Sequence, residues 1–149
     1  MKLGEVIKDL NSTDNVNARL DLLEELYWAE YEEDVSVAEL DGLSEILLLS
    51  ETLEEYFAIQ RLYSNPEGAM LDFYQDQILK LYSKDPLKFI KASTEYPEDG
   101  LNVLYIFRNK GYFSDYEIEK NKLISLSDSD DTTDRIELFF RMYDNLCHT

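Results

Sequence analysis

The residues able to do chemistry are mostly carboxylates. The 149-residue chain has 32 Asp and Glu but a single histidine, His148, and a single cysteine, Cys147, both at the end of the sequence. Histidine metal sites and Ser-His or Cys-His catalysis therefore lack their central residue. The five glycines are isolated, so no phosphate-binding loop is present. The sequence predicts no enzyme, no cofactor and no structural metal, with a carboxylate-dependent enzyme as the alternative.

The segment "SDSDDTTD", Ser127 to Asp134, resembles a calcium loop only in part. Counted from Asp128, acids occupy positions 1 and 3, but the glycine at position 6 is missing and Phe139 stands where the bidentate Glu belongs. Asp, Ser and Thr also cap helices and suit the positive end of the helix dipole. We therefore expect this segment to cap the last helix.

The segment "EELYWAEYEED", Glu24 to Asp34, concentrates six carboxylates and three aromatic rings. At about 100° per residue on a helix, Tyr27 faces the core while Trp28 projects between Glu24 and Glu32. A tryptophan among carboxylates can anchor a basic partner, because aromatic faces bind cations. The alternative is that another helix covers Trp28. The predicted partner-binding residues are Trp28, Tyr31, Glu24, Glu25 and Glu32.

Negative charge is the extreme property of the composition. The net charge is −18, and residues 1–60 hold 16 acids against 3 bases. Such a field repels nucleic acid and attracts basic proteins. The partner prediction is therefore a basic protein and no nucleic acid. The alternative is that the acidity serves only solubility.

Helix signals run along the whole chain. Leu3, Val6, Ile7 and Leu10 have helical spacing. Asn65-Pro66 and Asp85-Pro86 are cap-and-proline starts, and Pro97 opens a helix that ends at Gly111. Capping boxes are predicted at residues 36–39, 52–55, 114–117 and 134–137.

The segment "LNVLYIF" contains residues that favour strands, but no second strand-like run exists to pair with it. On a helix its apolar side chains cover nearly the whole circumference, which predicts a central, fully buried helix. The fold prediction is one all-α domain, residues 1–149, of eight or nine short helices in stacked hairpins or an irregular bundle.

The longest uninterrupted apolar run is "VLYIF", far short of the roughly 20 residues that span a membrane. The first residues lack the apolar region of a signal peptide. We expect no membrane insertion and favour the cytoplasm, with secretion or lipid anchoring after loss of a leader left open. The predicted function is an acidic helical interaction module, of inhibitor or immunity type, that binds a basic partner. The alternative is a helical scaffold or extracytoplasmic domain.

Overall fold

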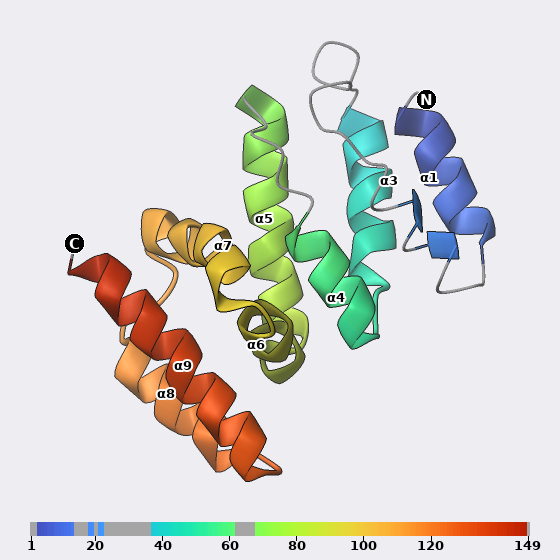
Figure 1. The fold of residues 1–149 in the computed structure, drawn as a ribbon. Helices are drawn as coiled ribbons and strands as arrows, with labels where there is room; N and C mark the ends of the chain where they lie inside the picture. Colours follow the sequence, from blue (N-terminus) through green and yellow to red (C-terminus); the bar gives the residue numbers. More distant parts are fainter. Residues whose placement is uncertain (1–2, 14–17, 20, 23–36, 62–67, 149) are drawn as a thin grey trace. The chain divides into compact units, whose positions relative to one another are not determined.

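The computed structural model describes the chain except residues 1–2, 14–17, 20, 23–36, 62–67 and 149. The described part is 83% helical, with eight helices and no strand (Figure 1), which confirms the all-α prediction. The helices are α1 (Leu3–Ser12), α3 (Val37–Leu48), α4 (Leu53–Gln60), α5 (Gly68–Lys84), α6 (Pro86–Thr94), α7 (Pro97–Lys110), α8 (Tyr116–Ser125) and α9 (Asp130–Cys147).

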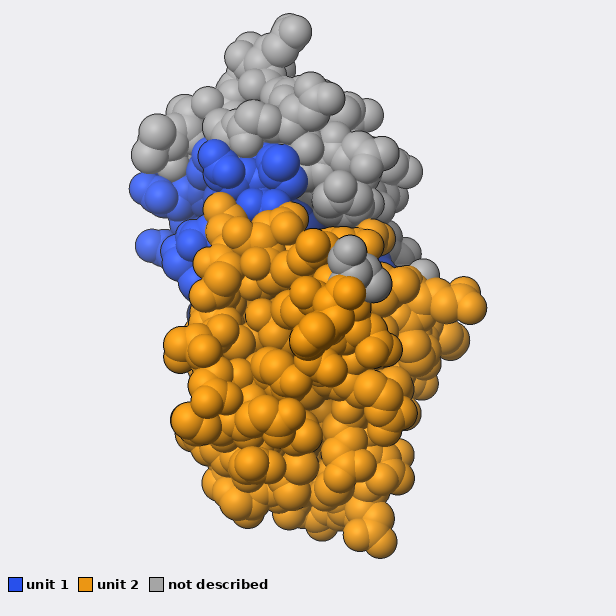
Figure 2. All heavy atoms as spheres, turned by 90° about the vertical axis from the view of Figure 1, so that its left-hand side faces the viewer, with its two compact units in different colours: residues 1–80 blue, residues 81–149 orange. Residues whose placement is uncertain are grey.

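The chain divides into two compact units. Unit 1 comprises residues 1–80, and unit 2 comprises residues 81–149. Figure 2 shows their atoms in different colours. Helix α5 contributes residues to both units, because the division falls after Lys80. The single-domain organisation stays a prediction.

Unit 1 is built on α1, α3, α4 and the first part of α5. Helix α1 packs against α3, and α5 is tied to its neighbours by polar contacts. The Tyr74 hydroxyl donates to the Gln60 carbonyl oxygen at 2.8 Å, and Ser44 donates to the Gln77 side chain at 2.7 Å. The apolar core includes Leu10, Leu43, Ile46, Leu47, Tyr56, Ile59, Tyr74 and Ile78.

Unit 2 is organised around α9, which contacts α6, α7 and α8. Helices α8 and α9 lie side by side in Figure 1. The apolar stripe of α9 recurs every three or four residues, so it forms one face of the helix. All of its members are buried, as the spacing predicts: Ile136, Phe139, Phe140, Tyr143 and Leu146.

Several predicted helix ends are confirmed. Thr52 and Glu55 form the expected capping box of α4, and the Asp85 side chain caps α6 before its N1 proline. Helix α7 ends at Gly111, which has φ +58°. The Gly111 N–H donates to the Arg108 carbonyl and the Tyr112 N–H to the Phe107 carbonyl, both at 3.1 Å. This is the Schellman arrangement, which glycine favours because it needs no Cβ in the left-handed region.

Two predicted helix starts are wrong. Asp115, rather than Ser114, is the N-cap of α8, because its carboxylate accepts the N–H groups of Glu117 and Ile118. Helix α9 begins at Asp130 with Ser129 as N-cap, not at the box headed by Asp134. Acidic residues in the first turn suit the helix dipole, so the helix extends back through them.

The expectation that α7 is buried all round is also wrong. Val103, Leu104, Ile106 and Phe107 are buried, but Tyr105 is 43% exposed. Helix α7 contacts α6 and α9, and these two neighbours leave its outer face to solvent. A tyrosine on that face is tolerated because its hydroxyl remains hydrated.

None of the helices that the structure describes combines the length and apolar character needed to cross a membrane. The longest, α9, carries charged residues along its outer side and ends at the exposed Cys147.

Candidate functional site

The predicted partner-binding residues of the acidic aromatic segment lie outside the described residues. They are Trp28, Tyr31, Glu24, Glu25 and Glu32. The assignment of a binding role to them stays a prediction. A described surface with the same combination of apolar and acidic side chains lies on the turn between α3 and α4.

The turn between α3 and α4 is built by hydrogen bonds that end one helix and begin the next. At the end of α3, Leu49 N–H donates to the Ile46 carbonyl at 3.1 Å and Ser50 N–H to the Leu47 carbonyl at 3.2 Å. At the start of α4, Glu55 N–H donates to Thr52 Oγ1 at 3.1 Å. The backbone groups that helix ends leave open are thus satisfied, which fixes the path of the turn.

The buried side chain of Glu55 stabilises the turn. Its Oε1 atom accepts from the backbone and hydroxyl of Thr52 at 3.3 and 3.1 Å. Oε2 lies 3.3 Å from a guanidinium nitrogen of Arg19, which also donates to the Ile46 carbonyl at 3.4 Å. A buried carboxylate needs such a partner. The ion pair joins Arg19 to α4, and the hydrogen bond of Arg19 to Ile46 joins it to α3.

The outer side of this turn exposes leucines beside carboxylates. Leu49 is 62% exposed and Leu53 is 37% exposed, and the side chains of Glu45, Glu51 and Glu54 are exposed as well. We call these five residues the α3–α4 face. Single exposed leucines are ordinary on protein surfaces. Leu49 and Leu53 flank one fixed turn, and the three glutamates lie within four residues of one of them in the sequence. Protein contacts commonly combine apolar and charged side chains in this way.

The leucines were missed by reasoning from the sequence, although a signal was present. The run "ILLL" at residues 46–49 comes directly before the predicted break near Ser50. Consecutive residues on a helix point about 100° apart, so four in a row cannot all face one core. Ile46 and Leu47 are buried, and Leu49 is the residue left outside.

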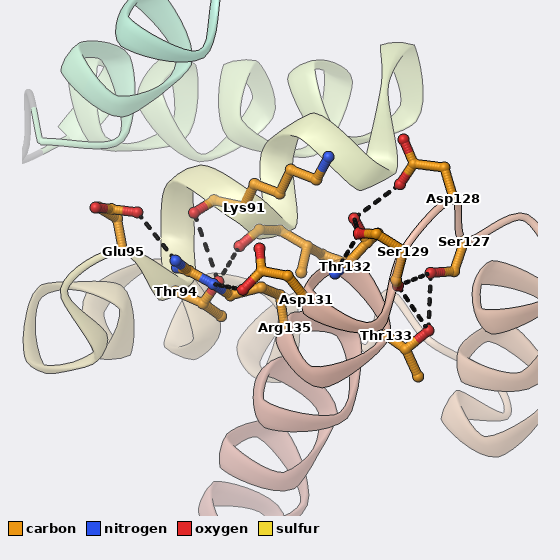
Figure 3. Close-up of polar contacts among 11 residues, drawn as sticks. Lys91, Thr94, Glu95, Ser127, Asp128, Ser129, Asp131, Thr132, Thr133 and Arg135 are labelled. Atoms are coloured by element: carbon orange, nitrogen blue, oxygen red, sulfur yellow. Dashed lines mark hydrogen bonds and ion pairs between the residues drawn. The ribbon is translucent and has the colours of Figure 1, made fainter.

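The "SDSDDTTD" segment proves to be a cap, as expected. Ser129 Oγ accepts the Thr132 N–H at 3.1 Å, and the Thr132 hydroxyl donates to Asp128 at 2.9 Å (Figure 3). The hydrogen bond from Thr132, aided by the charge of Lys91, lowers the pKa of Asp128. The described residues contain no group of three or more side chains placed to hold a metal ion.

The same cap is joined to the end of α6 by Arg135 (Figure 3). Its guanidinium lies 3.2 Å from the Glu95 carboxylate, 3.4 Å from the Thr94 hydroxyl and 3.8 Å from the Asp131 carboxylate. These partly exposed contacts connect α6 to α9. We interpret these contacts as structural, because Arg135 binds side chains of the α6 end and of its own helix.

Comparison with protein-family models, with curated proteins and with solved structures gives no match.

Proposed function

We propose that the chain is a non-enzymatic interaction module that binds a basic protein, and that the α3–α4 face is part of the contact. The observation that carries this proposal is the pair of exposed leucines, Leu49 and Leu53, among exposed carboxylates on a turn fixed by a capping box and a buried ion pair. A fixed turn loses little conformational freedom on binding, so less of the contact energy is spent on ordering it.

The charge of unit 1 supports a basic partner. Residues 1–80 hold 19 acids and 5 bases, whereas residues 81–149 hold 13 acids and 9 bases. Three of the bases in unit 1 have local partners: Arg19 pairs with Glu55, Lys80 lies 2.9 Å from Asp76, and the guanidinium of Arg61 lies over the Phe57 ring. The negative field of unit 1 is thus weakly opposed from within.

Charge and apolar area affect different steps of binding: charge acts mainly on the association rate and apolar area mainly on the dissociation rate. The long-range field accelerates the approach of a basic protein and loses strength as salt is added. The leucines act at contact, where burial of apolar surface slows dissociation. An inhibitor or immunity-type protein needs both properties, because it must reach its target quickly and stay bound.

The test compares two triple variants of the immobilised chain. The face variant carries Glu45→Gln, Leu49→Ala and Glu54→Gln. Proteins retained from a lysate at low salt are identified, and the strongest is purified for affinity measurement. We expect a partner with an isoelectric point above about 9. Its dissociation constant should rise about tenfold or more in the face variant, as for a contact that contains a hot spot.

The matched control carries Glu98→Gln, Leu126→Ala and Glu137→Gln, which make the same chemical changes at exposed positions of unit 2. It should bind the purified partner with wild-type affinity. Equal loss of affinity in both variants would assign binding to net charge rather than to the α3–α4 face. If neither variant differs from the wild type, the proposal is wrong and the acidity serves solubility.

A further inference from the structure

Unit 2 contains a cluster of aromatic rings, part of which lines a groove at the surface. The buried Tyr82 ring contacts Phe89, Phe107, Tyr112 and Phe113 edge to face, with centroids 5.2 to 5.6 Å apart. Edge-to-face contacts of this kind add stability beyond buried area alone. The rings are therefore a rigid wall rather than adaptable side chains.

A groove of about 440 Å³ opens against this wall, between the residues that precede α6 and the first turns of α8. Its volume lies within the range of roughly 300–1,000 Å³ that is usual for ligand sites. Its lining includes Tyr112, Phe113 and Ile118, of which Ile118 is 67% exposed.

Two carboxylates, those of Glu119 and Asp115, line the groove together with the hydroxyl groups of Tyr82, Ser83, Tyr112 and Ser114. The Glu119 Oε1 atom accepts from the Tyr82 hydroxyl at 2.8 Å, and the Asp115 Oδ1 atom accepts the backbone N–H groups that begin α8. Within the described part of the chain, the second oxygen of each carboxylate has no hydrogen-bond donor. Lys122 is the one basic residue in the lining.

We propose that this groove binds a guanidinium group, as carried by arginine. A guanidinium is planar and can stack on the exposed ring of Tyr112. It also offers five N–H donors in a fixed plane, which suit the carboxylates of Glu119 and Asp115. A lysine ammonium is compact and strongly hydrated, so it can satisfy the carboxylates but covers the ring poorly. This site lies in unit 2 and does not rest on the proposed role of the α3–α4 face.

Lys122 should repel a bound guanidinium group, so the proposal predicts in which direction the loss of its charge changes the binding affinity. Its ammonium carries the same charge as the guanidinium and lines the same groove. Removing the Lys122 charge should therefore strengthen binding, whereas removing the Glu119 charge should weaken it. A groove that binds through apolar contacts alone would respond to neither change.

The experiment is a titration of the ¹⁵N-labelled full chain, followed by amide chemical shifts. The probes are N-acetyl-L-arginine amide, free L-arginine and the neutral isostere N-acetyl-L-citrulline amide. We expect saturable shifts at residues 112–119 with an arginine probe and none of comparable size with citrulline. Saturation by the capped form alone assigns the guanidinium to arginine within a polypeptide. Saturation by free arginine as well assigns the site to the amino acid too.

Three variants complete the test. Glu119→Gln should weaken binding about fivefold or more, and its amide oxygen can still accept from Tyr82, so the fold is retained. Lys122→Gln should tighten binding about twofold or more. Glu117→Gln is the control, because it makes the same charge change on the same helix but lines a different hollow and pairs with Lys120. It should leave the affinity unchanged.

Equal shifts with arginine and citrulline would overturn the proposal, as would shifts confined to the acids of unit 1. Equal affinity of wild type and Glu119→Gln would do the same. Failure here leaves the α3–α4 face untouched, because the lysate and affinity test changes no residue of the groove. Conversely, loss of the basic partner in that test would not alter the arginine titration.

Discussion

Three tyrosines of unit 2 are held in the protonated state by their surroundings. The Tyr116 hydroxyl donates to Asp144 at 2.6 Å, and this hydrogen bond is the main cause that raises its pKa to about 12. Burial, with a smaller effect of Cys147, raises the pKa of Tyr143 to about 12. Burial and the Glu119 carboxylate raise the pKa of Tyr82 well above its usual range. Each phenol is thus more acidic in the unfolded chain than in the folded one.

Stability should therefore fall with rising pH in the alkaline range. Between about pH 10, where a free tyrosine ionises, and about pH 12, the folded chain keeps a proton on Tyr116 that the unfolded chain has lost. The free energy of unfolding then decreases as pH rises. Urea midpoints at stepped pH should fall less steeply for Tyr116→Phe than for wild type. Tyr105→Phe, which removes an exposed hydroxyl on α7, should keep the wild-type slope. Parallel slopes for all three proteins would contradict this account.

Neighbouring glutamates at the start of α4 should behave in opposite ways. Glu55→Ala removes the capping box and leaves Arg19 without its buried partner, so we expect a loss of about 3 kcal/mol in the free energy of unfolding. Glu54→Ala changes an exposed side chain and should cost less than about 0.5 kcal/mol. Chemical denaturation of both variants measures the difference. A loss of similar size in the two would show that the Arg19 contact contributes little.

At the scale of the helix, the sequence predicts the elements better than the surfaces they present. The starts at Thr52 and Asp85 follow from local caps, which depend only on adjacent residues. At Ser114 and Asp115 two adjacent residues can both cap, and in the structure the Asp115 carboxylate accepts the first N–H groups of α8. The apolar run at residues 46–49 indicates that one of its members must face away from the core, but which one depends on the helices that cover α3.

Two helical glycines provide a matched pair of tests. A Cβ on Gly42 in α3 would lie 3.8 Å from Ile7, at ordinary contact distance, so Gly42→Ala should stabilise unit 1 by up to about 1 kcal/mol. A Cβ on Gly100 in α7 would collide with the backbone carbonyl oxygen of Ser93 in α6. Gly100→Ala should therefore destabilise unit 2 by about 1–3 kcal/mol. Thermal unfolding that shifts in the same direction for both variants would refute the close approach of α7 to α6.

Across the whole molecule, charge is the property that sequence reasoning predicts most directly. The excess of 19 acids over 5 bases in residues 1–80 requires no knowledge of the fold. The exposure of Leu49 and Leu53 does require it, because a leucine stays at the surface only where no neighbouring helix covers it. The predicted acidic aromatic segment and the α3–α4 face both carry negative charge. The first can be predicted from the sequence alone, whereas the second can be recognised only once the fold is known.

The uneven charge should make salt act unequally on the two units. Raising the salt concentration from about 0.01 M to about 1 M shortens the screening length from about 30 Å to about 3 Å. Repulsion among the carboxylates of unit 1 should weaken, so amide hydrogen exchange in α1, α3 and α4 should slow. Exchange in α6 to α9 should change less, because 13 acids there face 9 bases. The variant Asp41→Asn with Glu45→Gln should reduce the salt effect on unit 1. A uniform response along the chain would count against self-repulsion in unit 1.

The exposed Cys147 at the end of α9 allows a distance within the unaltered chain to be followed by fluorescence energy transfer. It is the only thiol, so a maleimide dye attaches at one position in unit 2 without any substitution, and the only indole, Trp28, belongs to the sequence of unit 1. Excitation energy passed from the indole to a dye on Cys147 depends on the distance between one point in each unit. The unaltered protein can thus report, as a change in transfer efficiency, whether a bound partner draws the two units together or apart.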